Sequence, residues 1–498
     1  MTMISMLLAP VALSFIVYHL LVDGAPKGLP RIGIRGGISY FITALRFTIN
    51  TEQVLNEARK LFAGRSFAVP SLSGWVIVLD PHHLETLRSS DDTIFNQPTQ
   101  VSEMLQFDHL LNSNQQATPF HMSTVRKEFT KGIPQLLPNI LDETTVVLGQ
   151  ALKLLPGSEY TELPVMHDIP YIVARITNRA IVGTDLCRNE GFIKAVVHFA
   201  ETVFVHGRIL LWTPVILRPL AYFILSSVWG GSKQPLAFLK PYFAKRLEER
   251  TLSDDHPFNL AELLINDVPP HLASDIDDLS MRILNINFAS IHTSSLFFAH
   301  TLFEAAQMSP EDIDSIRIEV EQALEQEGGW TKSVLNKFTK IDSILREIAR
   351  FHGLTLFGMS RRTIADGLLS DGVVIPAGHE VAFDVRRIHF NPEVYRDPYR
   401  FDPFRFSKIR AETDCGAKYG FTTVDNHFLP FGLGRHACPG RFFASMQLKV
   451  IIAYFLLNYD IKFPAGQTTR PKNVVFAGAI FPPLNAHLLV KPRRRNTA

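Results

Sequence analysis

A ten-residue segment near the C-terminus, residues 431–440, constrains this chain more than any other feature. Glycines at two of its positions allow positive φ and let the backbone pass close to a flat partner. A cysteine follows them, just before the start of an expected helix, where backbone N–H groups and the helix N-terminus would stabilise a thiolate. The segment reads Phe431-Gly432-Leu433-Gly434-Arg435-His436-Ala437-Cys438-Pro439-Gly440.

The chemistry of this segment points to a metal-bound thiolate. An ionised Cys438 in an apolar loop, flanked by Phe431, suits axial ligation of haem iron. Arg435 and His436 supply positive charge for an acidic group alongside. Taken singly, the cysteine could equally be an inert, buried side chain in a Gly-rich turn. Only the complete ten-residue segment, taken together, argues against an inert buried cysteine.

Composition excludes other classes of protein. The 498 residues carry a net charge of +2, and no Lys/Arg run interleaves with aromatic residues, so no nucleic-acid partner is expected. Three cysteines form a poor disulfide framework and suit a reducing compartment.

The N-terminus predicts a transmembrane anchor. Residues 3–22 contain no Asp, Glu, Lys or Arg and are long enough to cross a bilayer as a helix. The nearest positive charges all follow this span, which places the rest of the chain in the cytosol. A cleaved secretory signal is the alternative, but the segment lacks a basic start and its apolar run is long. Residues 23–36 then form a Pro/Gly-rich hinge before a catalytic domain over 37–498.

Elsewhere the pattern predicts a mainly α protein with a small β portion. The expected elements are a hairpin over 65–80, helices through 120–350, strands at 373–375 and 381–383, an irregular stretch over 391–430, a helix over 442–459, and short strands near Val474 and Leu488.

One predicted helix is unusual because its apolar centre contains polar side chains. It begins near Ser274 and Asp277, which resemble a capping box, and continues to Met308. Buried polar groups need partners. Two interpretations stay open: the hydroxyls bond back to the preceding turn, or the helix faces a ligand, cofactor or water channel. The polar side chains are Asn285, Asn287, Ser290, His292, Thr293, Ser294 and Ser295.

Residues 431–440 resemble the signature of the cytochrome P450 haem-thiolate monooxygenases at every fixed position, Phe-x-x-Gly-x-(Arg or His)-x-Cys-x-Gly. The resemblance extends over nearly the whole chain. It implies the cytochrome P450 fold, haem b as cofactor and Cys438 as the iron ligand. It also places Phe431, Gly432, Arg435 and His436 around the cofactor.

The resemblance implies cations for the haem propionates as well. His436 fits by motif. Arg126 resembles the arginine of the family's Trp-x-x-x-Arg helix, although Met122 stands where the tryptophan would be. Arg361 is a further candidate, and spacing does not separate it from Arg362.

Glu347 and Arg350 form a Glu-x-x-Arg pair on one face of a predicted helix. The motif occurs at two other places in the chain, so position relative to the Cys438 loop selects this one. The family's third member is the arginine of Pro-x-Arg-Phe, here Arg405. The resemblance implies a buried ion network of these three side chains that holds the cysteine loop.

The polar helix resembles the family's oxygen-activating helix, (Ala/Gly)-Gly-x-(Asp/Glu)-Thr-(Thr/Ser). Thr293 matches the alcohol that helps deliver protons, and Ser294 completes the motif. His292 replaces the usual acid and Ser290 the usual glycine, and an imidazole can shuttle protons near neutral pH. The Ile-His-Thr string is typical of filamentous-fungal members, which predicts an enzyme of fungal specialised metabolism.

The family's pocket regions are mainly apolar in this chain, which predicts a lipophilic substrate such as a terpenoid. Each candidate could equally be an ordinary core residue. The candidates are Phe288, Ala289, Leu356, Phe357, Phe476 and Ile480, with Val203, Phe204, Leu210, Leu211 and Trp212 from the region around 200–225.

The resemblance implies insertion of one oxygen atom from O₂, with NADPH electrons from a separate membrane reductase. It also implies that this chain is a single-pass protein of the endoplasmic reticulum membrane with its catalytic domain in the cytosol. Cytochrome b5 is a second candidate partner. No dinucleotide fingerprint follows a predicted strand, so NADPH and flavins belong to the reductase. Two alternatives remain: an oxygen-independent haem-thiolate isomerase or dehydratase, and a non-catalytic haem-binding membrane protein. Thr293 beside an intact cysteine loop argues against the second.

Overall fold

The structure, a computed structural model, describes residues 26, 28–33, 37–111, 114–152, 160–250, 252, 256–413 and 416–493. The predicted membrane span over 3–22 and most of the predicted hinge over 23–36 lie outside the described residues.

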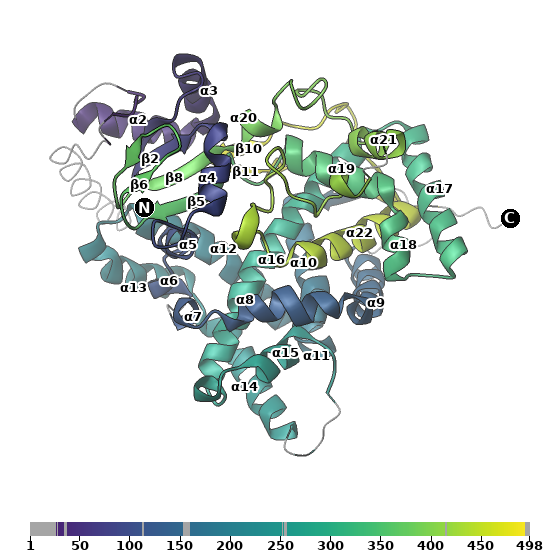
Figure 1. The fold of residues 1–498 in the computed structure, drawn as a ribbon. Coiled ribbons are helices and arrows are strands. Elements are labelled where there is room, and N and C mark those ends of the chain that lie inside the picture. Colours follow the sequence, from purple (N-terminus) through teal and green to yellow (C-terminus); the bar gives the residue numbers. More distant parts are fainter. Residues whose placement is uncertain are drawn as a thin grey trace.

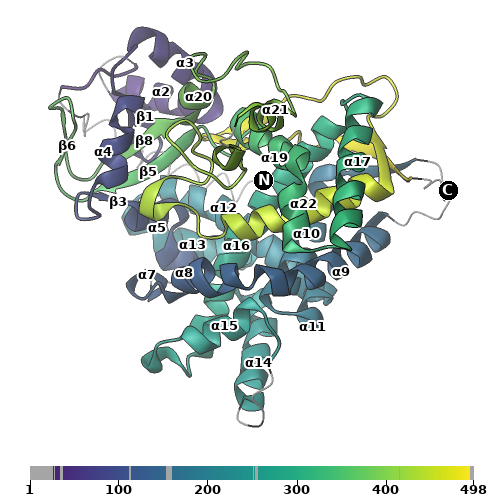
Figure 2. The ribbon, with the colours of Figure 1, turned by 45° about the vertical axis from the view of Figure 1, so that its right-hand side comes forward.

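Helices form most of the described chain, as predicted (Figure 1). The long helix α16 (Ile276–Ala305) crosses the middle of the molecule in both views (Figures 1 and 2). It packs against α10 (Val165–Ile181), α12 (Glu190–Trp212), α14 (Lys233–Glu249) and α22 (Arg441–Asn458). Apolar side chains of these helices form the largest buried cluster, so α16 is held on several sides by the core.

A five-stranded sheet lies at one corner of the molecule, beside α2 and α3 (Figure 1). The predicted hairpin forms from β1 (Phe67–Ser71) and β2 (Gly74–Leu79). β2 pairs in parallel with β8 (Glu380–Asp384), which pairs antiparallel with β5 (Phe357–Thr363). β3 (Phe95–Asn96) completes the order β1-β2-β8-β5-β3. Segments separated by some 300 residues therefore meet in one sheet.

Three smaller sheets complete the β portion of the described residues. The predicted strand at 373–375 is β7 (Val374–Ile375), which pairs with β6 (Gly367–Leu368) across a short turn. β10 (Val474–Phe476) pairs with β11 (Ala479–Phe481). β12 (His487–Pro492) lies between β4 (Thr161–Pro164) and β9 (Tyr459–Lys462).

The described chain contains further α-helices. Their bounds are α2 (Gly37–Ile49), α3 (Thr51–Leu61), α4 (Leu84–Ser89), α5 (Gln97–Leu105), α6 (Phe107–Leu110), α7 (Asn114–Ala117), α8 (Phe120–Thr124), α9 (Ile133–Leu152), α11 (Thr184–Cys187), α13 (Arg218–Trp229), α15 (Leu260–Asp267), α17 (Pro310–Glu327), α18 (Lys332–Lys337), α19 (Thr339–Phe351), α20 (Val385–His389) and α21 (Arg405–Glu412).

Two predictions about helices need correction. The stretch over 391–430 is not irregular throughout, because α21 (Arg405–Glu412) lies within it. The start of α16 is capped by Asp275 and not by Ser274, since the Asp275 carboxylate accepts a 2.9 Å hydrogen bond from the Asp278 backbone N–H.

Several of the polar side chains at the centre of α16 have hydrogen-bond partners. The hydroxyls of Ser290, Thr293 and Ser295 donate to carbonyls one turn earlier, at 2.7, 2.8 and 2.7 Å. Asn287 accepts a 2.6 Å hydrogen bond from Asn178. Back-bonding therefore accounts for these hydroxyls in the helix itself.

Within the described residues, the segments Val215–Trp229 and Lys233–Glu249, bent by 81°, are long and apolar enough to cross a membrane only when taken together. One single helix in that part of the chain has this length and hydropathy by itself, α12 (Glu190–Trp212). Its apolar window is 56% buried and it packs against α16. It is therefore a core helix of this fold.

Candidate functional site

Cys438 lies in the loop that leads into α22, with the backbone geometry its glycines predicted. Gly432 and Gly434 both have positive φ, +69° and +72°. A Cβ on Gly434 would lie 3.0 Å from Cγ of Arg88, so the close approach also requires glycine. The Cys438 N–H donates to the Phe431 carbonyl at 2.8 Å, which closes the loop.

The Cys438 thiol faces donors from the start of α22. Burial raises its pKa, while backbone N–H groups of Gly440 and Arg441 act in the opposite direction. The Arg441 guanidinium, which the sequence analysis did not single out, donates to the Cys438 carbonyl at 2.8 Å. The loop thus aims positive groups at the sulfur, and a metal ion bound there would deprotonate it.

A cavity of about 2150 Å³ opens beside Cys438. Drug-sized ligands occupy pockets of roughly 300–1,000 Å³, so this volume leaves room for a large flat group together with a substrate. Of the predicted cofactor residues, Cys438, Phe431, Gly432, His436, Arg126 and Arg361 line it, and Arg435 does not.

Positive charge gathers around the cysteine loop. Arg126 donates to the Arg435 carbonyl at 3.1 Å, which brings it to the loop from a segment 309 residues earlier. Asp92 pairs with both His436, at 2.9 Å, and Arg435, at 3.1 Å. Burial, together with Arg435, lowers the pKa of Arg361 to about 10, against the attraction of Asp92. One carboxylate therefore faces several cations.

Adjacent arginines on β5 face different parts of the cavity, which spacing alone left open. Arg361 interacts with Asp92 and Arg435 at the cysteine loop. Arg362 pairs with Glu103 at 3.2 Å instead. Successive strand residues point to opposite faces, so only one of the two can approach the loop.

Glu347, Arg350 and Arg405, the three side chains of the predicted ion network, contact one another. Arg350 donates to both carboxylate oxygens of Glu347, at 2.8 and 2.7 Å, and the Arg405 Nε lies 3.1 Å from the nearer oxygen. All three side chains are buried. Arg350 also donates to the carbonyls of His389 and Pro398, both at 2.9 Å. The network therefore spans α19, α21 and the segment between them.

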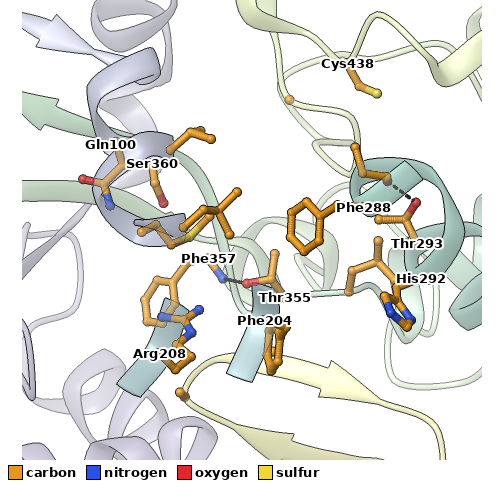
Figure 3. A pocket seen from close by; sticks show the side chains of 18 of the residues that line it. Gln100, Phe204, Arg208, Phe288, His292, Thr293, Thr355, Phe357, Ser360 and Cys438 are labelled. Atoms are coloured by element: carbon orange, nitrogen blue, oxygen red, sulfur yellow. Dashed lines mark hydrogen bonds between the residues drawn. The ribbon is translucent and has the colours of Figure 1, made fainter. Parts of the chain in front are cut away.

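Thr293 and His292 both line the cavity, but their side chains have different neighbours (Figure 3). In this view Thr293 lies between Cys438 and His292. The His292 ring bonds the backbone of Val197 on α12, and its Nε2 is buried without a partner among the described residues. Burial lowers its pKa to about 4, below the neutral range in which an imidazole can shuttle protons. Ser294 is buried and also lines the cavity.

The pocket candidates divide between the cavity and the core. Phe288, Ala289, Phe357 and Ile480 line the cavity, as do Phe204, Leu211 and Trp212. The others do not line it: Leu356, Val203 and Leu210 are fully buried elsewhere, and Phe476 is 40% exposed. Residues such as Leu356 and Phe476 neighbour cavity residues in sequence, and strand and helix geometry turns them away.

These residues fit the haem that the resemblance implies. A sulfur ligand opens onto a cavity large enough for the ring. Arg126, Arg361 and His436 line the same region, where Asp92 pairs with His436 and attracts Arg361. The surplus positive charge suits two propionate groups. Asp92 gave no signal in the sequence, because acids in a loop, such as the Asp91-Asp92 pair, are ordinarily solvated.

Comparisons with known proteins agree with this geometry. The sequence profile described as Cytochrome P450 matches residues 73–490. The chain is 32% identical to cytochrome P450 monooxygenase 103 of Postia placenta, over 93% of each protein. It is 26% identical to cytochrome P450 monooxygenase CYP512U6 of Ganoderma lucidum, over 91% of this chain and 89% of that protein.

The fold is similar to that of a solved structure, the retinoic acid bound cyanobacterial CYP120A1. The TM-score is 0.66 and the identity is 19%, with 94% of this chain and 98% of that one covered. The chain therefore belongs to the cytochrome P450 family, whose members use haem iron, and it is a cytochrome P450 monooxygenase.

Proposed function

We propose that this protein inserts one oxygen atom from O₂ into an apolar intermediate of fungal secondary metabolism, with a terpenoid as the expected class. The observation that carries the proposal is Cys438 at the wall of a largely apolar cavity that Thr293 also lines. The reaction takes R–H, O₂, two electrons and two protons to R–OH and water. NADPH supplies the electrons through a separate reductase, and cytochrome b5 is a second candidate donor.

Bound haem b would supply the activation of O₂. Cys438 would hold its iron, with Phe431 and Gly432 against the ring. Arg126, Arg361 and His436 would hold the propionates by charge-assisted hydrogen bonds.

Arg435 acts in this proposal through other residues. It does not line the cavity, but it shares Asp92 with His436 and its Nε lies 3.2 Å from the His436 Nε2. We infer that Arg435 positions His436.

Thr293 would hold a proton at its Oγ1 within the cavity. The hydroxyl donates to the Ala289 carbonyl at 2.8 Å, and its oxygen lone pairs stay available to accept a hydrogen bond from water. His292 is neutral and faces α12. We therefore propose that it shapes the cavity wall and makes it polar, and that it does not transfer protons. Phe288, Phe357 and Ile480 would exclude water and hold an apolar substrate.

We also propose that the protein is anchored in the endoplasmic reticulum membrane by residues 3–22, with the catalytic domain in the cytosol. Apolar side chains are exposed on two described helices and the turn before one of them, which favours contact with a lipid surface. They are Ile42, Leu45 and Ile49 on α2, and Val215, Ile216, Leu220 and Phe223 at α13.

An oxygen-independent isomerase or dehydratase is the second candidate, favoured by the replacement of the usual acid with a neutral His292. Dependence of turnover on NADPH and O₂ separates the two reactions.

The first test is the carbon monoxide difference spectrum of the dithionite-reduced protein. We expect a strongly red-shifted Soret band that Cys438→Ala abolishes. Cys187→Ala is the matched control, because Cys187 is also a free cysteine but lies in the core, away from the cavity. Folded protein without this band would refute the proposal.

A further inference from the structure

The cavity has a polar end that an entirely apolar substrate would leave unused. Arg208, Arg218 and Arg362 line it together with Glu103 and Glu380. Figure 3 shows Arg208 and Gln100 across the cavity from Cys438, with Phe288 between the two sides. Buried charges normally have partners, so the partner of each arginine decides what this end can bind.

Two of the three arginines are already engaged. Arg218 donates to the Thr213 carbonyl at 3.0 Å. Arg362 pairs with Glu103 at 3.2 Å. These two side chains organise the wall.

Arg208 is not engaged in this way. Its guanidinium extends from α12 into the cavity and lies 5.9 Å from the ring of Phe204, one turn earlier. It makes neither a hydrogen bond nor an ion pair with any residue in the described part of the chain. Burial lowers the pKa of Arg208, which indicates that its guanidinium cation is poorly solvated.

Glu380 is the acid that acts on Arg208, but it is not a full counter-ion. It attracts Arg208 without forming an ion pair, and the Gln100 side chain bonds it instead. Burial raises the pKa of Glu380, while Arg208 and the Gln100 side chain act in the opposite direction. Three arginines and two glutamates give this end an excess of one positive charge.

We propose that Arg208 binds the carboxylate of an otherwise apolar monocarboxylic acid, which is the substrate of the site assigned above. A planar guanidinium pairs with a carboxylate through two parallel hydrogen bonds. A single surplus charge suits a monoanion better than a dianionic phosphate. With its carboxylate held at Arg208, the molecule presents its apolar end along Phe288 toward Cys438. The inference rests on the proposed function and names its substrate class.

The test compares matched acids and esters on the purified full-length protein. The probes are abietic acid with methyl abietate, and dodecanoic acid with methyl dodecanoate. Dissociation constants come from calorimetry, which needs no haem signal, and from the shift of the Soret band. We expect each acid to bind at least tenfold more tightly than its ester. Arg208→Leu should weaken acid binding about 30-fold or more and leave the esters unchanged.

Two further variants keep the test decisive. Arg208→Lys retains the charge and should keep part of the acid preference. Arg362→Leu removes an arginine at the same end that is already paired, and should keep the preference. An acid that binds no better than its ester, or a preference that survives Arg208→Leu, overturns the inference. Loss of the carbon monoxide band would instead refute the haem-thiolate function, whatever the calorimetry shows.

Discussion

The ring of His389 accepts a 3.0 Å hydrogen bond from the backbone N–H of Leu429, two residues before the cysteine loop begins. The carbonyl of the same histidine accepts a hydrogen bond from Arg350. Burial and the nearby Arg350 lower the pKa of His389 to about 3, so its ring stays neutral and can accept. One histidine thus connects the ion network of Glu347 to the loop of Cys438.

His389→Phe should loosen the cysteine loop. The substitution leaves the buried N–H of Leu429 without an acceptor, at a cost of about 1–3 kcal/mol. We expect a lower ratio of haem to protein and a lower midpoint of thermal unfolding. His427→Gln, which changes an exposed ring in the same region, is the control. Equal haem content in both variants would contradict the connection.

Glu347→Ala should yield haem-free protein. Removing the carboxylate strands Arg350 and Arg405 as buried charges, at a cost of about 3–5 kcal/mol. Glu85→Ala is the matched control, because Glu85 and Arg88 show the same spacing on an exposed surface. Absorbance at the Soret band relative to 280 nm measures the outcome. A fully haem-loaded Glu347→Ala protein would refute the role of the network.

Arg361→Leu and Arg362→Leu should differ although the residues are adjacent. Arg361 faces the cysteine loop and Arg362 faces Glu103. Loss of a propionate partner should speed haem transfer to apomyoglobin about tenfold, equivalent to about 1.4 kcal/mol. Arg362→Leu should leave the transfer rate unchanged. Similar transfer rates in the two variants would refute the assignment of Arg361, and not Arg362, to a haem propionate.

Thr293→Ala should uncouple electron use from product formation. The variant removes the cavity hydroxyl that we assign to proton handling, so NADPH consumption should yield more hydrogen peroxide per product. Thr301→Ala, which removes another back-bonded hydroxyl of α16 away from the cavity, should remain coupled. The ratio of product to NADPH measures the effect, and unchanged coupling in Thr293→Ala would count against the role.

Acid should destabilise the fold through buried histidines such as His121. Burial and Arg282 lower its pKa to about 4, below the 6.5 expected on unfolding. Between these values only the unfolded state binds the proton. The free energy of unfolding should therefore fall as pH decreases from about 6.5 to 4, by up to ~1.4 kcal/mol per pH unit.

His121→Asn should flatten this dependence, measured as the urea midpoint at pH 7 and pH 5. His167→Asn, at an exposed ring, should leave it unchanged. An identical slope in His121→Asn and the unmodified protein would show that His121 is not responsible.

Local patterns were enough to predict much of this protein. The hairpin at β1 and β2, the helix after the cysteine loop and the positive φ of Gly432 and Gly434 follow from residues close together in sequence. The motif around Cys438 predicted the family because its spacing reflects one loop and one helix start. Such features depend on backbone preferences within about ten residues, which composition and spacing directly report.

Contacts between distant segments were decided only by the tertiary structure. It turned Arg361 and not Arg362 toward the loop, placed Asp92 beside His436, and buried Leu356 away from the cavity. It also left Arg208 in the cavity without an ion pair to the described residues. Strand pairing and helix packing determine which of two neighbouring side chains faces a cavity, and these depend on segments hundreds of residues apart. The sequence alone therefore predicted the chemistry of the site, and the packing of the fold determined which charges surround it.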